Sequence, residues 1–101
     1  MRVIQRIRQA IRDQRYRISS HANEEMSNDS FVAEDIESII LTGHVTRRFT
    51  RDQRGTRYEV AGVTVDGRRG CVLCRFLSSG GLLIITAFEQ EGVKNDKDGR
   101  T

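Results

Sequence analysis

The sequence predicts a small α+β domain in which N-terminal helices pack on one face of a four-strand antiparallel meander sheet. The chain has 101 residues, which is the length of one domain. Its apolar residues recur at helical spacing up to Gly43 and with a period of two afterwards. Asp66-Gly67, between two strand-like stretches, is a hairpin signal. We expect a single domain over residues 1–89 and a disordered tail over 90–101, which is polar and rich in Gly, Lys and Asp.

The first part of the chain is predicted to be helical. Residues 2–14 form an amphipathic helix with arginines away from its apolar stripe. Residues 16–19 alternate, which fits either a short edge strand or an extended link. A short helix is expected over 21–26. A third helix begins near residue 33 with acidic residues in its first turn, buries three isoleucines and ends at Gly43.

Four strands follow in the predicted meander. The first covers 44–51, and the second covers 56–65 with a bulge near 61–62, where the phase of the apolar residues slips. The third covers 69–77. The last, 82–88, is apolar on both faces, so we expect it to be central and covered.

Charge alternates in blocks along the chain. The net charge is +5 over residues 1–20, −6 over 21–43 and +5 over 44–77, and fifteen of the seventeen basic residues are Arg. Arginine suits bidentate contacts with phosphate or carboxylate groups. The alternative is a set of solvated faces in an arginine-rich chain, and a homodimer that pairs the basic first helix with the acidic third helix is a further possibility.

Several classes of protein are disfavoured. No apolar run approaches the length of a membrane span, and the apolar residues at the N-terminus are periodic rather than contiguous, which is unlike a secretory signal. We therefore expect a cytoplasmic protein.

Cys71 and Cys74 lie three apart on a predicted strand and should face opposite ways, so we expect structural cysteines that neither bridge nor share a metal. No metal and no cofactor are expected.

His21 is the best single candidate for a reactive group. It lies at the start of a predicted helix, after Ser19 and Ser20, which are good helix caps. Histidine titrates near neutral pH and can both give and take a proton. The alternative is a structural histidine that hydrogen-bonds a backbone group.

Arginines concentrate on the first three predicted strands. Antiparallel pairing should bring some of them together, and like charges side by side repel unless an anion lies between them, so we expect a phosphate site. Tyr58 is the aromatic candidate to stack a base or position a phosphate. The alternative is an exposed face whose arginines pair with the acidic third helix of this chain or of a partner. The arginines are Arg47 and Arg51 on one face of the first strand, Arg48 on its other face, and Arg57, Arg68, Arg69 and Arg75 from the next two strands.

Four stretches between residues 16 and 89 resemble a bacterial family of small domains with a Ser-x-His-Ala type start. They are Ser20-His21-Ala22-x-x-x-Met26, Glu34-Asp35-Ile36-x-x-Ile39, the hairpin Tyr58 to Gly67, and Ile84-Ile85-Thr86-Ala87-Phe88-Glu89. That family looks like the RelE/MqsR-like toxin fold. In this fold, a curved antiparallel sheet backed by helices cleaves RNA without a metal.

The resemblance implies a metal-independent endonuclease (an mRNA interferase) of a toxin–antitoxin pair. Its expected partners are single-stranded RNA and a zinc-ribbon antitoxin-like protein. The alternative is a non-catalytic RNA- or protein-binding module of the same fold. His21 would act as base or acid, with Tyr58 as orienter and Arg57 or Arg75 as phosphate clamp. The expected RNA-binding residues are Arg47, Arg57 and Arg69, and Thr86 is a supporting residue.

Overall fold

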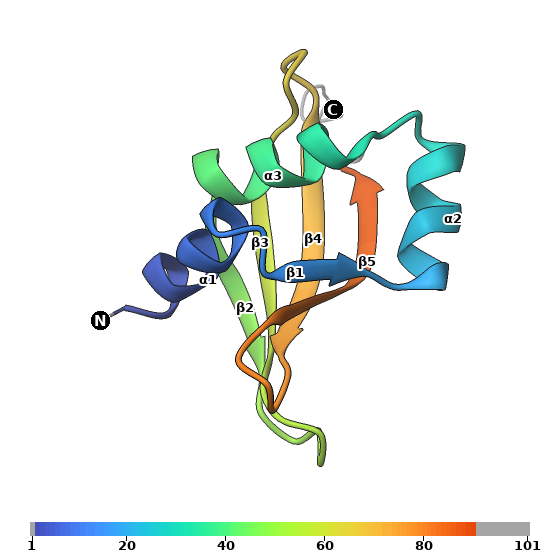
Figure 1. Ribbon diagram of the computed structural model, residues 1–101. Helices are drawn as coiled ribbons and strands as arrows, with labels where there is room; N and C mark the ends of the chain where they lie inside the picture. Colours follow the sequence, from blue (N-terminus) through green and yellow to red (C-terminus); the bar gives the residue numbers. More distant parts are fainter. Residues whose placement is uncertain (1, 91–101) are drawn as a thin grey trace, which may run out of the picture.

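The computed structural model describes residues 2–90 of the chain. This part contains three helices and five strands, so the predicted mixed α+β class is confirmed (Figure 1). The predicted disordered tail lies, from residue 91 onward, outside the described residues. In chain order the elements are α1 (Val3–Arg12), β1 (Tyr16–Ile18), α2 (Ser20–Asn28), α3 (Ala33–Thr42), β2 (His44–Phe49), β3 (Arg57–Val63), β4 (Arg69–Phe76) and β5 (Leu82–Glu89).

The sheet has five strands in the order β1-β5-β4-β3-β2, so the prediction of a four-strand antiparallel sheet is wrong. Strands β2 to β5 do form the predicted antiparallel meander. The additional strand, β1, runs parallel to β5, with Tyr16 opposite Leu82 and Ile18 opposite Ile84. A segment of three residues has too short a pattern to separate a strand from a link. Tertiary packing decides, because Tyr16 and Ile18 both pack against the core.

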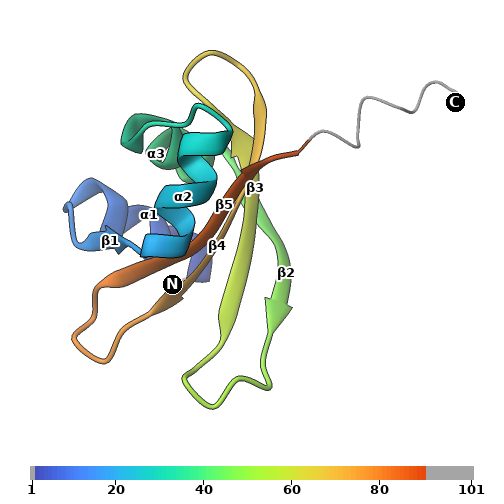
Figure 2. The ribbon, with the colours of Figure 1, turned by 90° about the vertical axis from the view of Figure 1, so that its right-hand side faces the viewer.

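All three helices lie on one side of the sheet, which we call the inner face (Figure 2). We call the opposite side the outer face, and no helix of residues 2–90 covers it. The core fills the space between the helices and the inner face, where alternate strand residues are buried. The largest fully buried side chains are Ile7, Ile11, Ile36, Ile39, Ile40, Val60, Val72, Cys74, Leu82 and Ile84.

The second strand of the predicted meander, which is β3 in the structure, does not bulge at residues 61–62 as the sequence predicts. Strand β3 pairs with β4 without a break, and Gly62 lies opposite Gly70 on the inner face. A Cβ atom on Gly62 would collide with the backbone oxygen of Ile39, so the glycine lets α3 sit close to the sheet. The apparent phase slip arises because Val63 faces outward, 38% exposed, rather than from a bulge. The irregularities in the ladder lie instead on β2 between Val45 and Arg47, and where β5 passes Leu73 and Cys74 of β4.

Strand β5 is internal, as predicted, but only its inner face is covered by helices. On the outer face Leu83 lies opposite Arg75 and is half-buried, and Phe88 lies opposite Cys71 and is 36% exposed. The strand is thus apolar on both faces, although a second layer of structure covers only one of them. The outer face of the sheet therefore presents apolar side chains at its β5 side.

Helix α2 completes the edge of β5 beyond the end of β1. Strand β1 pairs with β5 only as far as Ile84. Further along, Ala87 N donates to Glu25 Oε1 at 3.0 Å, and Glu89 N donates to Asp29 Oδ2 at 2.8 Å. Glutamate and aspartate one helical turn apart thus meet alternate backbone N–H groups of a strand, since a helical turn rises about 5.4 Å and two strand residues span about 6.6 Å. Two backbone donors that would otherwise lie open at the edge are satisfied.

Within residues 2–90, none of the three helices has the length and apolar character needed to span a membrane.

Candidate nucleic-acid interface

Five side chains form a row across the outer face, one from each strand. Arg17 lies opposite Leu83, Leu83 opposite Arg75, Arg75 opposite Arg57, and Arg57 opposite Phe49. We call this set the outer row. Strand residues alternate between faces, and the neighbours of the row in β1 and β5 pack into the core, so the row faces outward. All three charged members are arginines, and the other two are apolar.

The centre of the outer row is the pair Arg57 and Arg75, which are direct partners on adjacent antiparallel strands. Arg57 Nε lies 3.3 Å from Asp52 Oδ2, and Arg75 Nη1 donates to the backbone oxygen of Arg54 at 3.5 Å. The pKa of the Asp52 carboxyl is held below its usual value, first by the backbone N–H of Arg54 and then by the charges of Arg54, Arg57 and Arg75. One carboxylate therefore faces three guanidinium groups, and the local charge is positive.

Phe49 lies close to two guanidinium groups at the β2 end of the row. The Arg47 guanidinium carbon is 5.4 Å from the centre of the ring and the Arg57 carbon is 5.1 Å from it. Both distances are within the range of a cation–π contact. A hollow of about 410 Å³ opens beside the ring. Its lining residues are Arg48, Phe49, Thr50, Arg51, Asp52 and Arg57.

The remaining residues of the predicted RNA site on the outer face lie in other rows. Arg47 lies opposite Glu59 of β3, and Thr86 lies in the same row on β5. Arg69 is at the start of β4, opposite Val63, and is exposed. The outer face thus holds Arg47, Arg69 and Thr86 together with the outer row, but at different distances from it along the strands.

His21 lies in the first turn of α2 with 65% of its side chain exposed. Ser19 caps this helix as predicted, because its hydroxyl accepts a hydrogen bond from Ala22 N at 3.0 Å. His21 Nε2 is 3.4 Å from Glu25 Oε2, and the other oxygen of the same carboxylate accepts from Ala87 N. An exposed imidazole is thus oriented by a carboxylate that the sheet itself holds.

Tyr58 is on the inner face, so the structure does not bring it together with Arg75. Its ring packs edge-on against Phe76, with centroids 6.5 Å apart, and the guanidinium of Arg48 lies 5.8 Å from its centre. Arg48 is in register with Tyr58 and shares its face, as the alternation predicts. The three predicted catalytic residues therefore occupy three places: the start of α2, the inner face and the outer face.

Cys71 and Cys74 face opposite sides of the sheet, as predicted, and both thiols are free and buried. Burial raises the pKa of Cys74 to about 12. Burial, and to a smaller extent the charge of Glu59, raises the pKa of Cys71. Among residues 2–90, no three side chains of His, Cys, Asp or Glu are grouped so that they could hold a metal ion.

The acidic third helix is not the partner of the outer-face arginines within this chain. Tyr16 and Gln14 donate to the Glu37 carboxylate at 2.5 and 3.2 Å. Asp35 is buried and accepts from Val32 N and Val65 N at 3.0 and 3.1 Å. Of the arginines named in the sequence analysis, Arg68 does pair with this helix, since its Nη2 lies 3.8 Å from Asp35 Oδ2, so the alternative holds for Arg68 and not for the outer row.

Arg68 has a structural role and does not take part in the predicted phosphate cluster. It donates to the backbone oxygens of Asp29 and Ser30 at 2.7 and 3.1 Å, and it pairs with Asp66 and Glu89 at 3.1 and 3.5 Å. Its guanidinium thus joins the end of α2, the β3–β4 hairpin and the end of β5. Arg51 also lies elsewhere than predicted, since β2 ends at Phe49 and Arg51 falls in the following loop.

The sequence alone does not identify Phe49 and Arg17 as residues of the candidate site. The sequence predicts a strand at Phe49 but no role for its ring, and residues 16–19, which include Arg17, fit either a strand or a link. For Phe49 the signal is its position two residues after Arg47, which places both on one face beyond the irregularity in β2. For Arg17 the signal is the apolar pair that flanks it, which indicates that it points away from the core.

Comparisons with known proteins give a family. A search of curated proteins found no match to the chain, and a search of solved structures found none either. Residues 18–89 match the family described as "Domain of unknown function (DUF4258)". The matched region begins at the end of β1 and reaches the end of β5, and it leaves out α1. Because this region is most of the chain, the protein is a member of the DUF4258 family.

Proposed function

We propose that the protein binds single-stranded RNA on the outer face of its sheet. The observation that carries the proposal is the direct cross-strand pairing of Arg57 with Arg75, next to Phe49. Neighbouring strands are about 4.8 Å apart, so two guanidinium groups so placed repel each other unless an anion lies near both. Asp52 supplies a single carboxylate beside them. A phosphate, which accepts bidentate hydrogen bonds from arginine, would complete the site.

Phe49 adds a contact that suits single strands. Its ring is partly exposed and opens into the hollow of about 410 Å³. Stacking of an unpaired base on an aromatic ring contributes about 1–3 kcal/mol and tolerates any base. In a duplex the bases already stack on one another, so this contact is open only to unpaired nucleotides. Arginines for the phosphates and a ring for the bases are the combination that single-strand sites use.

Metal-independent cleavage by a RelE/MqsR-like fold is the second candidate, and the orientation of His21 by Glu25 favours it. In this reaction a base removes the proton of a 2′-hydroxyl, and the 2′-oxygen bonds to the adjacent phosphorus. The bond from phosphorus to the 5′-oxygen then breaks, and that oxygen takes up a proton. The products are a 2′,3′-cyclic phosphate and a 5′-hydroxyl. His21 would be the base, and arginines would stabilise the charge that develops on the phosphate.

Binding stands ahead of cleavage because Tyr58, the proposed orienter, lies on the opposite face from Arg75. The toxin reading also implies a zinc-ribbon antitoxin-like partner, and this remains part of the second proposal. Loss of cleavage in H21A with unchanged RNA affinity would support it. RNA left intact by the wild type would contradict it without touching the binding proposal.

The binding proposal is tested by the affinity of the full chain for a fluorescent uridine hexamer. We expect R57A, R75A and F49A each to weaken binding, and the two arginine variants to flatten its salt dependence. Each lost phosphate contact should reduce the slope of log K against log salt by about 0.7. R12A is the matched control, since Arg12 is an exposed arginine of α1 on the helix side. Equal effects of R12A and R57A would contradict a site on the outer face.

A further inference from the structure

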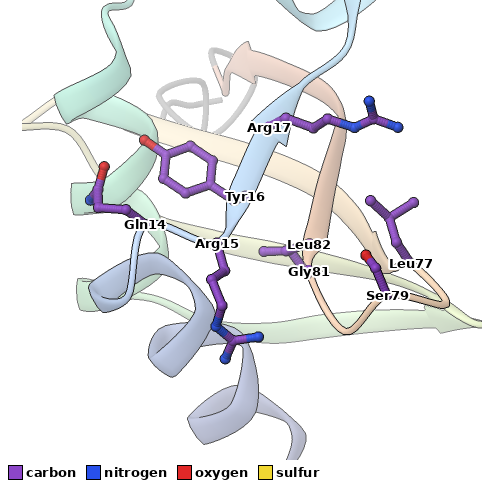
Figure 3. Close-up of a pocket in the computed structure, with 8 residues that line it drawn as sticks. All are labelled: Gln14, Arg15, Tyr16, Arg17, Leu77, Ser79, Gly81 and Leu82. Atoms are coloured by element: carbon purple, nitrogen blue, oxygen red, sulfur yellow. The ribbon is translucent and has the colours of Figure 1, made fainter.

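A second hollow lies at the β1 end of the outer row (Figure 3). Its volume is about 530 Å³, and it opens between β1 and the hairpin that joins β4 to β5. It is at the opposite side of the sheet from Phe49, since β1 and β2 are the two edge strands. Its lining residues are Gln14, Arg15, Tyr16, Arg17, Leu77, Ser79, Gly81 and Leu82.

Arg17 is the cation of this hollow that remains free to bind a ligand. Figure 3 shows Tyr16 pointing one way from β1 and Arg17 pointing the other. The Tyr16 hydroxyl is bound to Glu37, and Arg15 is bound to the backbone oxygen of Gly80 at 3.2 Å. The Arg17 side chain is exposed and makes no hydrogen bond or ion pair with any other residue of 2–90.

The register of the sheet links this hollow to the RNA site. Arg17 is separated from Arg75 by Leu83 alone, and Arg75 adjoins Arg57. With strands about 4.8 Å apart, Arg17 lies roughly 10 Å from Arg75 and roughly 19 Å from Phe49 along the row. A ligand that crosses the strands at this level would meet a ring, two adjacent arginines, an apolar side chain and a third arginine.

We propose that the β1 hollow is a second phosphate subsite for the same RNA strand, with Arg17 as its contact residue. The inference rests on the proposed function, and it adds the path of the strand, which runs across the sheet from Phe49 to Arg17. Stacked nucleotides place one phosphate per about 3.4 Å, so roughly 19 Å corresponds to about six nucleotides, and to fewer when the strand is extended. The Ser79 hydroxyl supplies a further hydrogen-bond donor at the end of this path.

The path predicts that the contribution of Arg17 depends on the length of the RNA. A uridine hexamer reaches both ends of the outer row, whereas a dimer held at Phe49 and Arg57 does not reach Arg17. We expect R17A to lower the affinity for the hexamer by roughly three- to tenfold, which is the typical loss of one solvent-exposed hydrogen-bond contact. R17A should leave the affinity for the dimer unchanged. R17K keeps the charge and should retain most of the hexamer affinity.

The experiment measures fluorescence anisotropy of uridine dimer and hexamer on wild type, R17A, R17K, R57A and R12A over a range of salt. R17A should reduce the salt slope for the hexamer by about 0.7, while R12A should leave it unchanged. If R57A weakens the hexamer but R17A behaves as R12A does, the subsite is wrong and the proposed function stands. If the wild type binds neither RNA, both fall. Circular dichroism of R17A and R17K shows that each variant is folded.

Discussion

Ala87 N donates a hydrogen bond to Glu25 Oε1 at 3.0 Å, across the junction of α2 and β5. The second oxygen of this carboxylate lies 3.4 Å from His21 Nε2. One side chain therefore ties a helix to a sheet edge and orients the exposed imidazole. The Glu25 carboxylate therefore stabilises the fold through the backbone of β5 and can also take part in any chemistry at His21.

Replacing Glu25 should lower stability in a graded way. E25A leaves the Ala87 N–H without its acceptor at a partly buried edge, and we expect a loss of about 1–2 kcal/mol in the free energy of unfolding. E25Q keeps a carbonyl oxygen that can accept the same bond, so its loss should be smaller. Urea unfolding of the three proteins measures this difference. Equal stability of E25A and the wild type would mean that the bond contributes nothing.

Arg68 should be the arginine whose loss most reduces thermal stability. It joins backbone oxygens at the end of α2 to carboxylates of the β3–β4 hairpin and β5. R68K should also lose stability, because one ammonium group cannot reproduce the planar fork of the guanidinium. Arg69, the next residue, is exposed and provides the control. Thermal scans should place R68A and R68K below R69A, and the reverse order would contradict this assignment.

The glycine pair beneath α3 should respond unequally to added methyl groups. A Cβ atom on Gly62 would meet the backbone oxygen of Ile39, whereas one on Gly70 would meet the end of the Ile39 side chain. A flexible side chain moves more cheaply than a helix backbone. We expect G62A to cost about 2–3 kcal/mol and G70A less, as judged by urea unfolding. A larger loss in G70A would show that α3 shifts more easily than the Ile39 rotamer.

Alkaline pH should destabilise the protein through Cys74. Burial raises the pKa of its thiol from 9.0 to about 12, so above pH 9 the unfolded chain loses a proton that the folded chain keeps. The contribution to stability is complete below pH 9 and falls between pH 9 and about 12, by up to about 1.4 kcal/mol per pH unit.

Urea unfolding from pH 8 to about pH 10.5 tests this by comparing the wild type with C74A. The variant should start from a lower stability, because it leaves a small cavity, but its stability should fall less steeply with pH. C71A, from the other face of the same strand, removes a thiol whose pKa burial also raises, so its stability should fall less steeply with pH than that of the wild type but more steeply than that of C74A. A slope in C74A as steep as that of the wild type would contradict the role of this thiol.

Hydrophobic period predicts most of the fold. The change from helical spacing to alternation near Gly43 locates the three helices and the meander, and alternation places Cys71 and Cys74 on opposite faces. The sequence does not determine whether β1 is a strand, because three residues give too short a pattern and the outcome depends on Tyr16 packing under α3. The false bulge at Gly62 has a similar origin, since only the position of α3 explains a glycine there.

The candidate site is less predictable than the fold. Composition indicates an arginine-bearing sheet, but it does not assign faces. Tyr58 and Arg57 are adjacent in sequence, and the pleat sends them to opposite sides. Arg68 looks like Arg69 in the sequence, yet the hairpin turns it toward carboxylates and backbone oxygens. Phe49 and Arg17 join the site only through the register of strands far apart in the chain.

The central claim is that RNA lies on the outer face, and backbone amide shifts in a titration with uridine hexamer test it most directly. We predict shifts and line broadening at Phe49, Arg57, Arg75 and Leu83, with little change in α1 and α3. The R57A/R75A double variant should lose these changes while keeping a folded spectrum. Shifts confined to the helices, with the outer row unchanged at saturating RNA, would contradict the claim.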